Sequence, residues 1–144
     1  MDLFDETPSH VDPIMLGVLG VHNTITKQEI HEKILHPLMS VLGRVPELIV
    51  LPSEGISSAY ISIWCNRHNV NTHAVEADWK KFQRKAGILR DARIQKEATH
   101  FLIFVGPKSK TYEATAIRLA KKGKRVFVVD HDPIAMVEYV VEES

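Results

Sequence analysis

The chain has 144 residues, 44% of them hydrophobic and 25% charged, and its formal net charge is zero. This length and composition predict one soluble domain with a substantial hydrophobic core. The zero net charge argues against bulk binding to nucleic acid or to a membrane surface, and no apolar run approaches the roughly 20 residues that span a bilayer. A single cysteine, Cys65, excludes an intramolecular disulfide. Because the N-terminus also lacks a signal-peptide pattern, a cytoplasmic location is expected.

The N-terminal part of the chain predicts a leader, a strand and a helix. Residues 1–13 are rich in acidic residues and proline, so we expect a flexible leader ahead of a single domain at 14–144. The apolar run Ile14–Val21 predicts a strand that is buried on both faces. Thr26 and Glu29 have the spacing of a capping box, which predicts the start of a helix.

The remaining elements alternate between strand and helix. Pro37 is expected to kink the first helix, and Gly43 is expected to end it. Further strands are expected at 47–51, 70–76, 100–105 and 125–129, and further helices at 57–69, 88–98, 111–122 and 134–141. This alternation predicts an α/β domain: a Rossmann-like, doubly wound parallel sheet of about five strands in the order 3-2-1-4-5, with helices on both faces.

In this strand order, ligands bind outside the carboxyl ends of the strands, between the first and the fourth. Three loops are expected to meet there. Their candidate ligand-binding residues are His22 and Asn23 after the first strand, Ser53, Gly55, Ser57 and Ser58 after the second, and Lys108, Ser109, Lys110 and Thr111 after the fourth. Amides, hydroxyls and lysines at a helix start can hold a phosphate, although serine and threonine are also ordinary helix caps.

The segment at 77–91 is the most informative part of the sequence, and it reads Ala-Asp-Trp-Lys-Lys-Phe-Gln-Arg-Lys-Ala-Gly-Ile-Leu-Arg-Asp. It places Arg90 and Arg93 in the first turns of the helix expected at 88–98. Cations there oppose the positive end of the helix dipole, so a bound anion would explain them. The alternative is a solvated basic crossover. For Trp79 we expect packing beneath this segment rather than stacking on a base.

Other kinds of site have little support in the sequence. It has no Walker loop, no Gly-x-Gly-x-x-Gly after the first strand and no Gly-x-Ser-x-Gly. The eight histidines and Cys65 do not have metal-ligand spacing, so neither a metal nor a cofactor is expected. Glu54 and Glu113 remain as catalytic candidates, because cleavage of a glycosidic bond needs a carboxylate. Glu54 could instead accept from a ribose hydroxyl, or do neither.

On these residues the chain resembles the SLOG superfamily, within it the YspA-like and YpsA-like branch of small Rossmann-like proteins. The matching motifs are Ala77-Asp78-Trp79 and Ala86-Gly87-Ile88-Leu89-Arg90-Asp91. The resemblance runs from about 14 to 129 and is specific only over 77–111. It implies a nucleotide-derived or related phosphorylated ligand over the carboxyl edge of the sheet, with Asp78, Gly87 and Arg90 among the residues that bind it.

One departure from the related phosphoribohydrolases bears on catalysis. They carry Pro-Gly-Gly-x-Gly-Thr-x-x-Glu, and this chain has Ala114 where that glutamate would fall. Glu113 lies one position earlier, about 100° around a helix. We therefore expect a sensor or sequestering protein that binds a nucleotide-derived small molecule without catalysis. Two alternatives stay open, a hydrolase or transferase of nucleotide N-glycosidic bonds and a protein-interaction module on a degenerate scaffold, as does assembly into a homo-oligomer.

Overall fold

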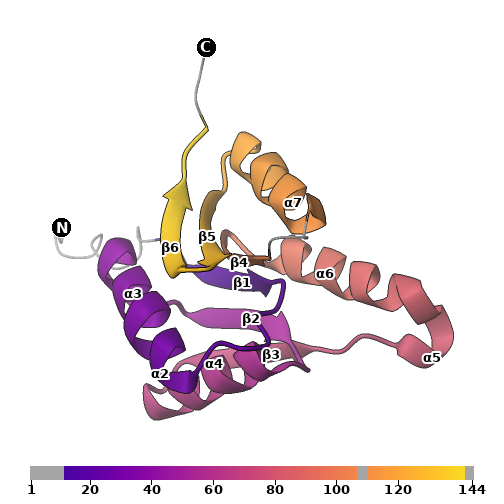
Figure 1. Cartoon of the computed structure of the whole chain (residues 1–144), viewed down its shortest axis with the longest axis horizontal. Helices are drawn as coiled ribbons and strands as arrows, with labels where there is room; N and C mark the ends of the chain where they lie inside the picture. Colours follow the sequence, from indigo (N-terminus) through magenta and orange to yellow (C-terminus); the bar gives the residue numbers. More distant parts are fainter. Residues whose placement is uncertain (1–11, 107–109, 142–144) are drawn as a thin grey trace, which may run out of the picture.

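A six-stranded sheet with helices on both faces makes up the computed structural model, which describes residues 12–106 and 110–141 (Figure 1). The strands are β1 Met15–Leu19, β2 Leu48–Pro52, β3 Asn71–Val75, β4 His100–Val105, β5 Arg125–His131 and β6 Ile134–Tyr139. They lie in the order β3-β2-β1-β4-β5-β6, and the first five are parallel. The predicted fold class and the order 3-2-1-4-5 are therefore confirmed. Residues 1–11 of the predicted leader lie outside the described residues.

The helix expected at 134–141 is wrong, because this segment forms β6. It pairs antiparallel with β5, so the sheet has six strands rather than about five. Its side chains alternate: Ile134 and Met136 pack against the core, and Val137 is mostly exposed. Residues 132–133, which suggested a helix cap, instead form the turn between the two strands. The period of two along β6 matches a strand with one face on the core.

The helices are α2 Lys27–Glu29, α3 His36–Leu42, α4 Ile56–Arg67, α5 Trp79–Phe82, α6 Ala86–Glu97 and α7 Lys110–Lys121, with a π-helical segment at Ile30–Leu35 and a 3₁₀ turn at Gln83–Lys85. Thr26 caps α2 through the predicted capping box with Glu29. Where Pro37 was expected to kink the helix, a π-helical segment lies just before it, and the N–H of His36 bonds to the carbonyl of His31. No helix in the described part of the chain is long and apolar enough to cross a membrane.

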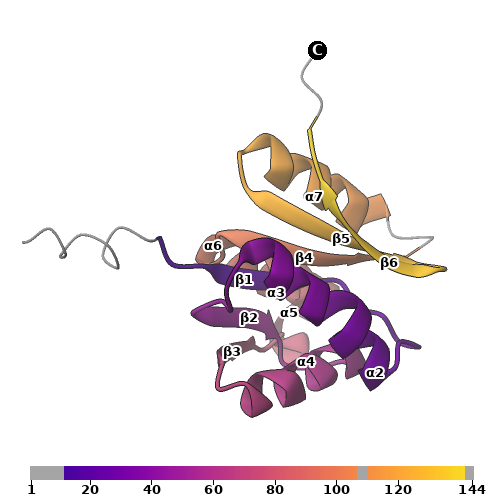
Figure 2. The ribbon, with the colours of Figure 1, turned by 90° about the vertical axis from the view of Figure 1, so that its left-hand side faces the viewer.

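Two hydrophobic clusters attach the helices to the two faces of the sheet. On one face the helices from α2 to α4 pack through residues such as Ile34 and Ile61, and Figure 2 shows them in front of the sheet. On the other face, α6 and α7 pack through Ile94 and Leu119. A β-carbon on Gly17 would lie 2.7 Å from Cβ of Ala98, so this glycine lets the end of α6 approach β1. The packing brings the starts of α6 and α7 to the carboxyl edge of the sheet.

Candidate functional site

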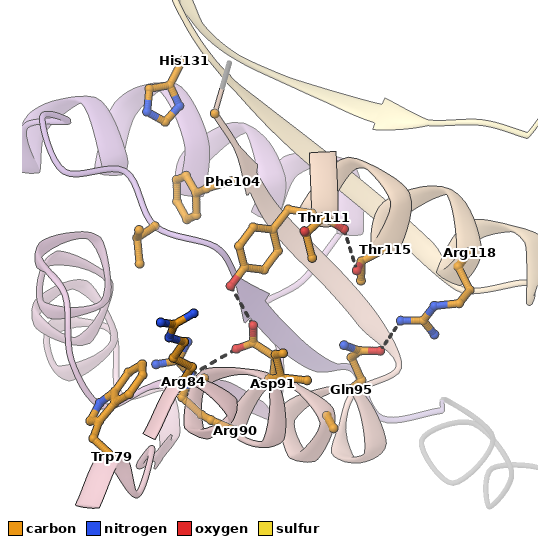
Figure 3. Close-up of a pocket in the computed structure, with 16 residues that line it drawn as sticks. Trp79, Arg84, Arg90, Asp91, Gln95, Phe104, Thr111, Thr115, Arg118 and His131 are labelled. Atoms are coloured by element: carbon orange, nitrogen blue, oxygen red, sulfur yellow. Dashed lines mark hydrogen bonds and ion pairs between the residues drawn. The ribbon is translucent and has the colours of Figure 1, made fainter. Parts of the chain in front are cut away.

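A cavity of about 970 Å³ lies between α6 and α7 and reaches the ends of β1 and β4 (Figure 3). We call it the α6–α7 cavity. Its apolar wall includes Val21, Ile88, Ala92 and Phe104, and its polar residues are Arg84, Arg90, Asp91, Gln95, Thr111, Tyr112, Thr115, Arg118 and His131. Small-molecule sites commonly have volumes of about 300 to 1,000 Å³. The cavity thus has the size of a ligand site. It also includes the carboxyl ends of β1 and β4, where ligands bind in sheets of this strand order.

Arg90 is the most buried cation of the cavity, with 8% of its surface exposed. Its Nε donates to Oδ1 of Asp91 at 3.1 Å, and its Nη1 donates to Oε1 of Glu54 at 3.2 Å. A guanidinium has five N–H donors. Because these two hydrogen bonds are its only ones to described residues, three donors remain for a ligand.

Two side-chain bridges join α6 to α7 across the cavity (Figure 3). The Tyr112 hydroxyl donates to Oδ2 of Asp91 at 2.7 Å, and Arg118 donates to Oε1 of Gln95 at 2.7 Å. Burial, together with the hydrogen bond to Asp91, raises the pKa of Tyr112 to about 12. The phenol therefore stays protonated at neutral pH, and both oxygens of Asp91 are occupied. Figure 3 shows Trp79, Arg84 and Arg90 at one end of the cavity and Arg118 at the other.

Trp79 forms part of the cavity wall and packs on α6. Its helix, α5, is capped by Asp78, which accepts from the backbone N–H of Lys81. The indole Nε1 donates to Oε1 of Glu54 at 2.8 Å, the same oxygen that Arg90 contacts. A β-carbon on Gly87 would lie 3.3 Å from the indole, so glycine makes room for this packing. Asp78 thus serves as a helix cap, whereas Gly87 lines the cavity.

The predicted residues after β1 are close to the cavity without lining it. His22 is 2% exposed, and its ring stacks on that of His131, a lining residue, with 3.8 Å between the ring centroids. Burial and the neighbouring His131 lower the pKa of His22, so its ring is neutral at neutral pH. The backbone N–H of His22 donates to the Ser57 hydroxyl. Asn23 is exposed and outside the lining.

Of the predicted residues after β2 and β4, some are buried or line the cavity and others are exposed. Ser58 is buried in α4 with Ser57, whereas Ser53 and Gly55 are exposed on the loop that precedes this helix. Thr111 lines the cavity, and Lys110 is exposed at the start of α7. Two further candidates, Lys108 and Ser109, lie outside the described residues.

Glu113, the other catalytic candidate, faces away from the α6–α7 cavity. It lines a separate hollow of about 450 Å³ between α7 and the last two strands, which we call the β6 hollow. The lining of this hollow comprises Val105, Glu113, Ala116, Ile117, Val128, Asp130, Val137, Glu138, Tyr139 and Val140. The two glutamates named from the sequence therefore lie at different places, with Glu54 alone in contact with cavity residues.

The structure offers little for metal binding or thiol chemistry. Within residues 12–106 and 110–141, no three His, Cys, Asp or Glu side chains form a group that could hold a metal ion. Cys65 is buried in α4, and burial raises the pKa of its thiol to about 12. The protonated, inaccessible thiol has the character of a core side chain rather than a nucleophile.

Seven polar residues that line the cavity were not among the predicted site residues: Arg84, Asp91, Gln95, Tyr112, Thr115, Arg118 and His131. Helical spacing could have found Thr115 and Arg118, since they lie four and seven residues after the predicted Thr111 and so on the same face of a helix. His131 has no such signal, because only the stacking on His22 places it at the cavity.

Comparisons of the chain with protein-family models, with curated proteins and with solved structures give no match. Its function must therefore be inferred from the geometry of the cavity.

Proposed function

We propose that this protein binds a nucleotide or nucleotide-derived phosphorylated ligand in the α6–α7 cavity, acting in the cytoplasm as a sensor or sequestering protein without catalysis. The observation that carries the proposal is the guanidinium of Arg90. It is nearly buried, it lines a cavity of ligand size, and three of its N–H donors have no partner among the described residues. Arginine suits this role because its planar fork of N–H groups matches the oxygens of a phosphate.

The charge and chemistry of the cavity lining support the same ligand class. Of the described residues that line it, three are arginines (Arg84, Arg90 and Arg118) and one is a carboxylate, Asp91. Phosphate is therefore attracted, while the apolar wall suits a sugar or base. The resemblance to the SLOG superfamily supports this ligand as well, since the motif from Ala86 to Asp91 opens α6 at the cavity.

Binding without catalysis is supported by the state of the carboxylates. Hydrolysis of an N-glycosidic bond by the usual route needs a carboxylate at the anomeric carbon. Glu113 lines the β6 hollow, and both oxygens of Asp91 accept hydrogen bonds, from Arg90 and Tyr112. Glu54 already accepts from Arg90 and from the Trp79 indole.

The direct test is calorimetric titration with the four common nucleoside 5′-monophosphates and 5′-diphosphates, followed by chromatography of the mixtures for released base. We expect binding without release of base. The control is Glu113→Gln, which should bind as the wild type does. Release of base that Glu54→Gln abolishes would establish an enzyme. If no nucleotide binds and none co-purifies, as judged by mass spectrometry, the chain would instead be a protein-interaction module.

A further inference from the structure

One oxygen of Glu54 binds Arg90, the residue to which we assign the anion of the ligand. Oε1 of Glu54 accepts from Nη1 of Arg90 at 3.2 Å and from Nε1 of Trp79 at 2.8 Å. Asp91 contacts the same guanidinium from the other side. Arg90 is thus flanked by two carboxylates, and the three groups together carry one net negative charge at neutral pH. An anion that bound to the remaining donors of Arg90 would lie beside both carboxylates and be repelled by them, so displacement of one carboxylate favours binding.

Glu54 is the carboxylate that can leave. Its side chain is 52% exposed and lies on the loop between β2 and α4, so it can turn into solvent without opening the core. The Asp91 side chain is only 13% exposed, and Tyr112 and Arg90 hold both of its oxygens. Moving Asp91 away from Arg90 would leave the Asp91 carboxylate nearly buried and without its cation. This costs far more free energy than moving the exposed Glu54 carboxylate into water.

The charge of the ligand then decides whether the exchange is favourable. A carboxylate or a phosphodiester carries one negative charge, as Glu54 does. Replacing Glu54 by either of them would therefore gain no electrostatic attraction to Arg90. A phosphate monoester carries about 1.5 to 2 negative charges at pH 7 and three acceptor oxygens. It can also draw on Arg84, a lining residue without an ion-pair partner among the described residues.

On the basis of the proposed function, we infer that Glu54 determines the specificity of the cavity. With Glu54 present, ligands that end in a phosphate monoester bind, whereas phosphodiesters and carboxylates do not. The internal carboxylate competes with every anion for Arg90 and the Trp79 indole. Only an anion with a larger charge and more acceptor oxygens outcompetes it.

The inference predicts a particular pH dependence. The second pKa of a phosphate monoester is about 6, so wild-type affinity should fall between pH 7.5 and 5.5 as the phosphate becomes singly charged. Besides Arg90, the titratable and charged groups that line the cavity are Arg84, Asp91 of α6, Tyr112 and Arg118 of α7, and His131, on which His22 stacks. Protonation of a histidine would strengthen anion binding at low pH, which is the opposite direction.

The test compares each nucleoside 5′-monophosphate with its 5′-phosphate methyl ester, which keeps the base and both ribose hydroxyls but carries one charge. Affinities are measured by calorimetry for the wild type, Glu54→Gln, Arg90→Gln and the control Glu113→Gln. We expect the wild type and Glu113→Gln to prefer the monoester at least tenfold. In Glu54→Gln the methyl ester should bind more tightly, so that the preference falls below about threefold and its pH dependence flattens. Arg90→Gln should lose both ligands.

Three other outcomes of these titrations would contradict the specificity role of Glu54 or the proposed function. Equal wild-type affinity for the two forms, or an unchanged preference in Glu54→Gln, would overturn the specificity role and leave the proposed function intact. If Glu54→Gln keeps its melting temperature but loses both ligands, Glu54 binds the ligand rather than excluding it. If none of the nucleotides binds to either the wild type or Glu54→Gln, the proposed function fails, and this inference fails with it.

Discussion

Helix α7 has a hollow on each side, and the two hollows have opposite charge. The α6–α7 cavity is lined by three arginines and one aspartate, whereas the β6 hollow is lined by Glu113, Asp130 and Glu138, with no lysine or arginine from the described ranges. The chain has 18 basic and 18 acidic residues, so its zero net charge conceals this separation. The total charge argues against bulk polyanion binding, but it does not show that one hollow is suited to a single small anion.

The helical repeat of α7 explains how one short helix can serve both hollows. Thr111, Thr115 and Arg118 are spaced by four and three residues and face the α6–α7 cavity. Glu113 and Ile117 have the same spacing of four but face the β6 hollow. Substitutions on the two sides of α7 should therefore have separable effects.

The largest expected effect is the loss of stability caused by Gly20→Ala. Gly20 follows β1 with φ of 78°, and a β-carbon there would lie 2.3 Å from the carbonyl oxygen of Phe104, a cavity residue. We expect a loss of about 3 kcal/mol in the free energy of unfolding, from the strained backbone and overpacking. Gly43→Ala is the matched control: its φ is 81°, but no atom lies within 4 Å of the new β-carbon. Chemical denaturation of Gly43→Ala should show a loss of only about 1 kcal/mol in the free energy of unfolding.

Arg90→Ala should weaken nucleotide binding tenfold or more, because a charge-assisted contact contributes about 1.5 to 3 kcal/mol. Its burial adds a second effect, since Asp91 would be left without its cation, and the free energy of unfolding should fall by about 1 to 3 kcal/mol. Calorimetry and denaturation measure the two effects separately. Glu113→Ala, on the other side of α7, should leave the affinity unchanged and lower the free energy of unfolding by about 0.3 to 1 kcal/mol, because Glu113 lies in the first turn of α7. Unaltered affinity in a folded Arg90→Ala variant would contradict the role of Arg90.

Tyr112→Phe tests the bridge across the cavity. It removes the hydrogen bond to Asp91 while keeping the ring, and we expect a loss of about 1 kcal/mol in the free energy of unfolding. Tyr139→Phe is the comparison in the β6 hollow, where the described residues give that hydroxyl no hydrogen bond. Denaturant unfolding of both variants should show a loss for Tyr112→Phe alone, and equal losses would mean that the bridge contributes nothing.

The smallest expected effect is a loss of stability in mild acid. The pKa of His22 is lowered in the folded state by burial and by His131, so the unfolded chain binds the proton more tightly. The stabilisation from neutral His22 is therefore complete above the unfolded pKa of about 6.5 and decreases as the pH falls through it. The free energy of unfolding should drop between pH 7 and 5.5, and His22→Gln should reduce that slope. The pKa of His100 is also lowered, chiefly by burial, so part of the slope should remain.

Most of the fold was predictable because its signals are local. Apolar runs and helical stripes predicted the first five strands and the longer helices between them, but not the short helix α5. Chain order with right-handed crossovers then predicted the order of these strands. The strand β6 was missed because Asp132 and Pro133 suit a helix start and a turn equally well. Pairing with β5, a tertiary contact, decides between the two.

The candidate site was predictable only in outline. The strand order led to the edge of the sheet where the cavity lies. The expected conflict with the helix dipole drew attention to Arg90, but α6 begins at Ala86 rather than at 88, so Arg90 lies in its second turn, where the dipole acts weakly. The contacts that define the cavity join distant residues: Tyr112 lies 21 positions from Asp91, and Trp79 lies 25 positions from Glu54. No local pattern signals such pairs, since they exist only after α5, α6 and α7 have packed.

The burial of Cys65 has a practical consequence for observing α5. Burial raises the pKa of this thiol to about 12 and leaves only 1% of Cys65 exposed, so the thiol is protonated at pH 8 and shielded from reagents. Because the chain has no other cysteine, a Lys80→Cys variant would carry a single reactive thiol, on the exposed surface of α5. A fluorophore or spin label attached there would report the motion of this segment alone, without removing any native residue from the core.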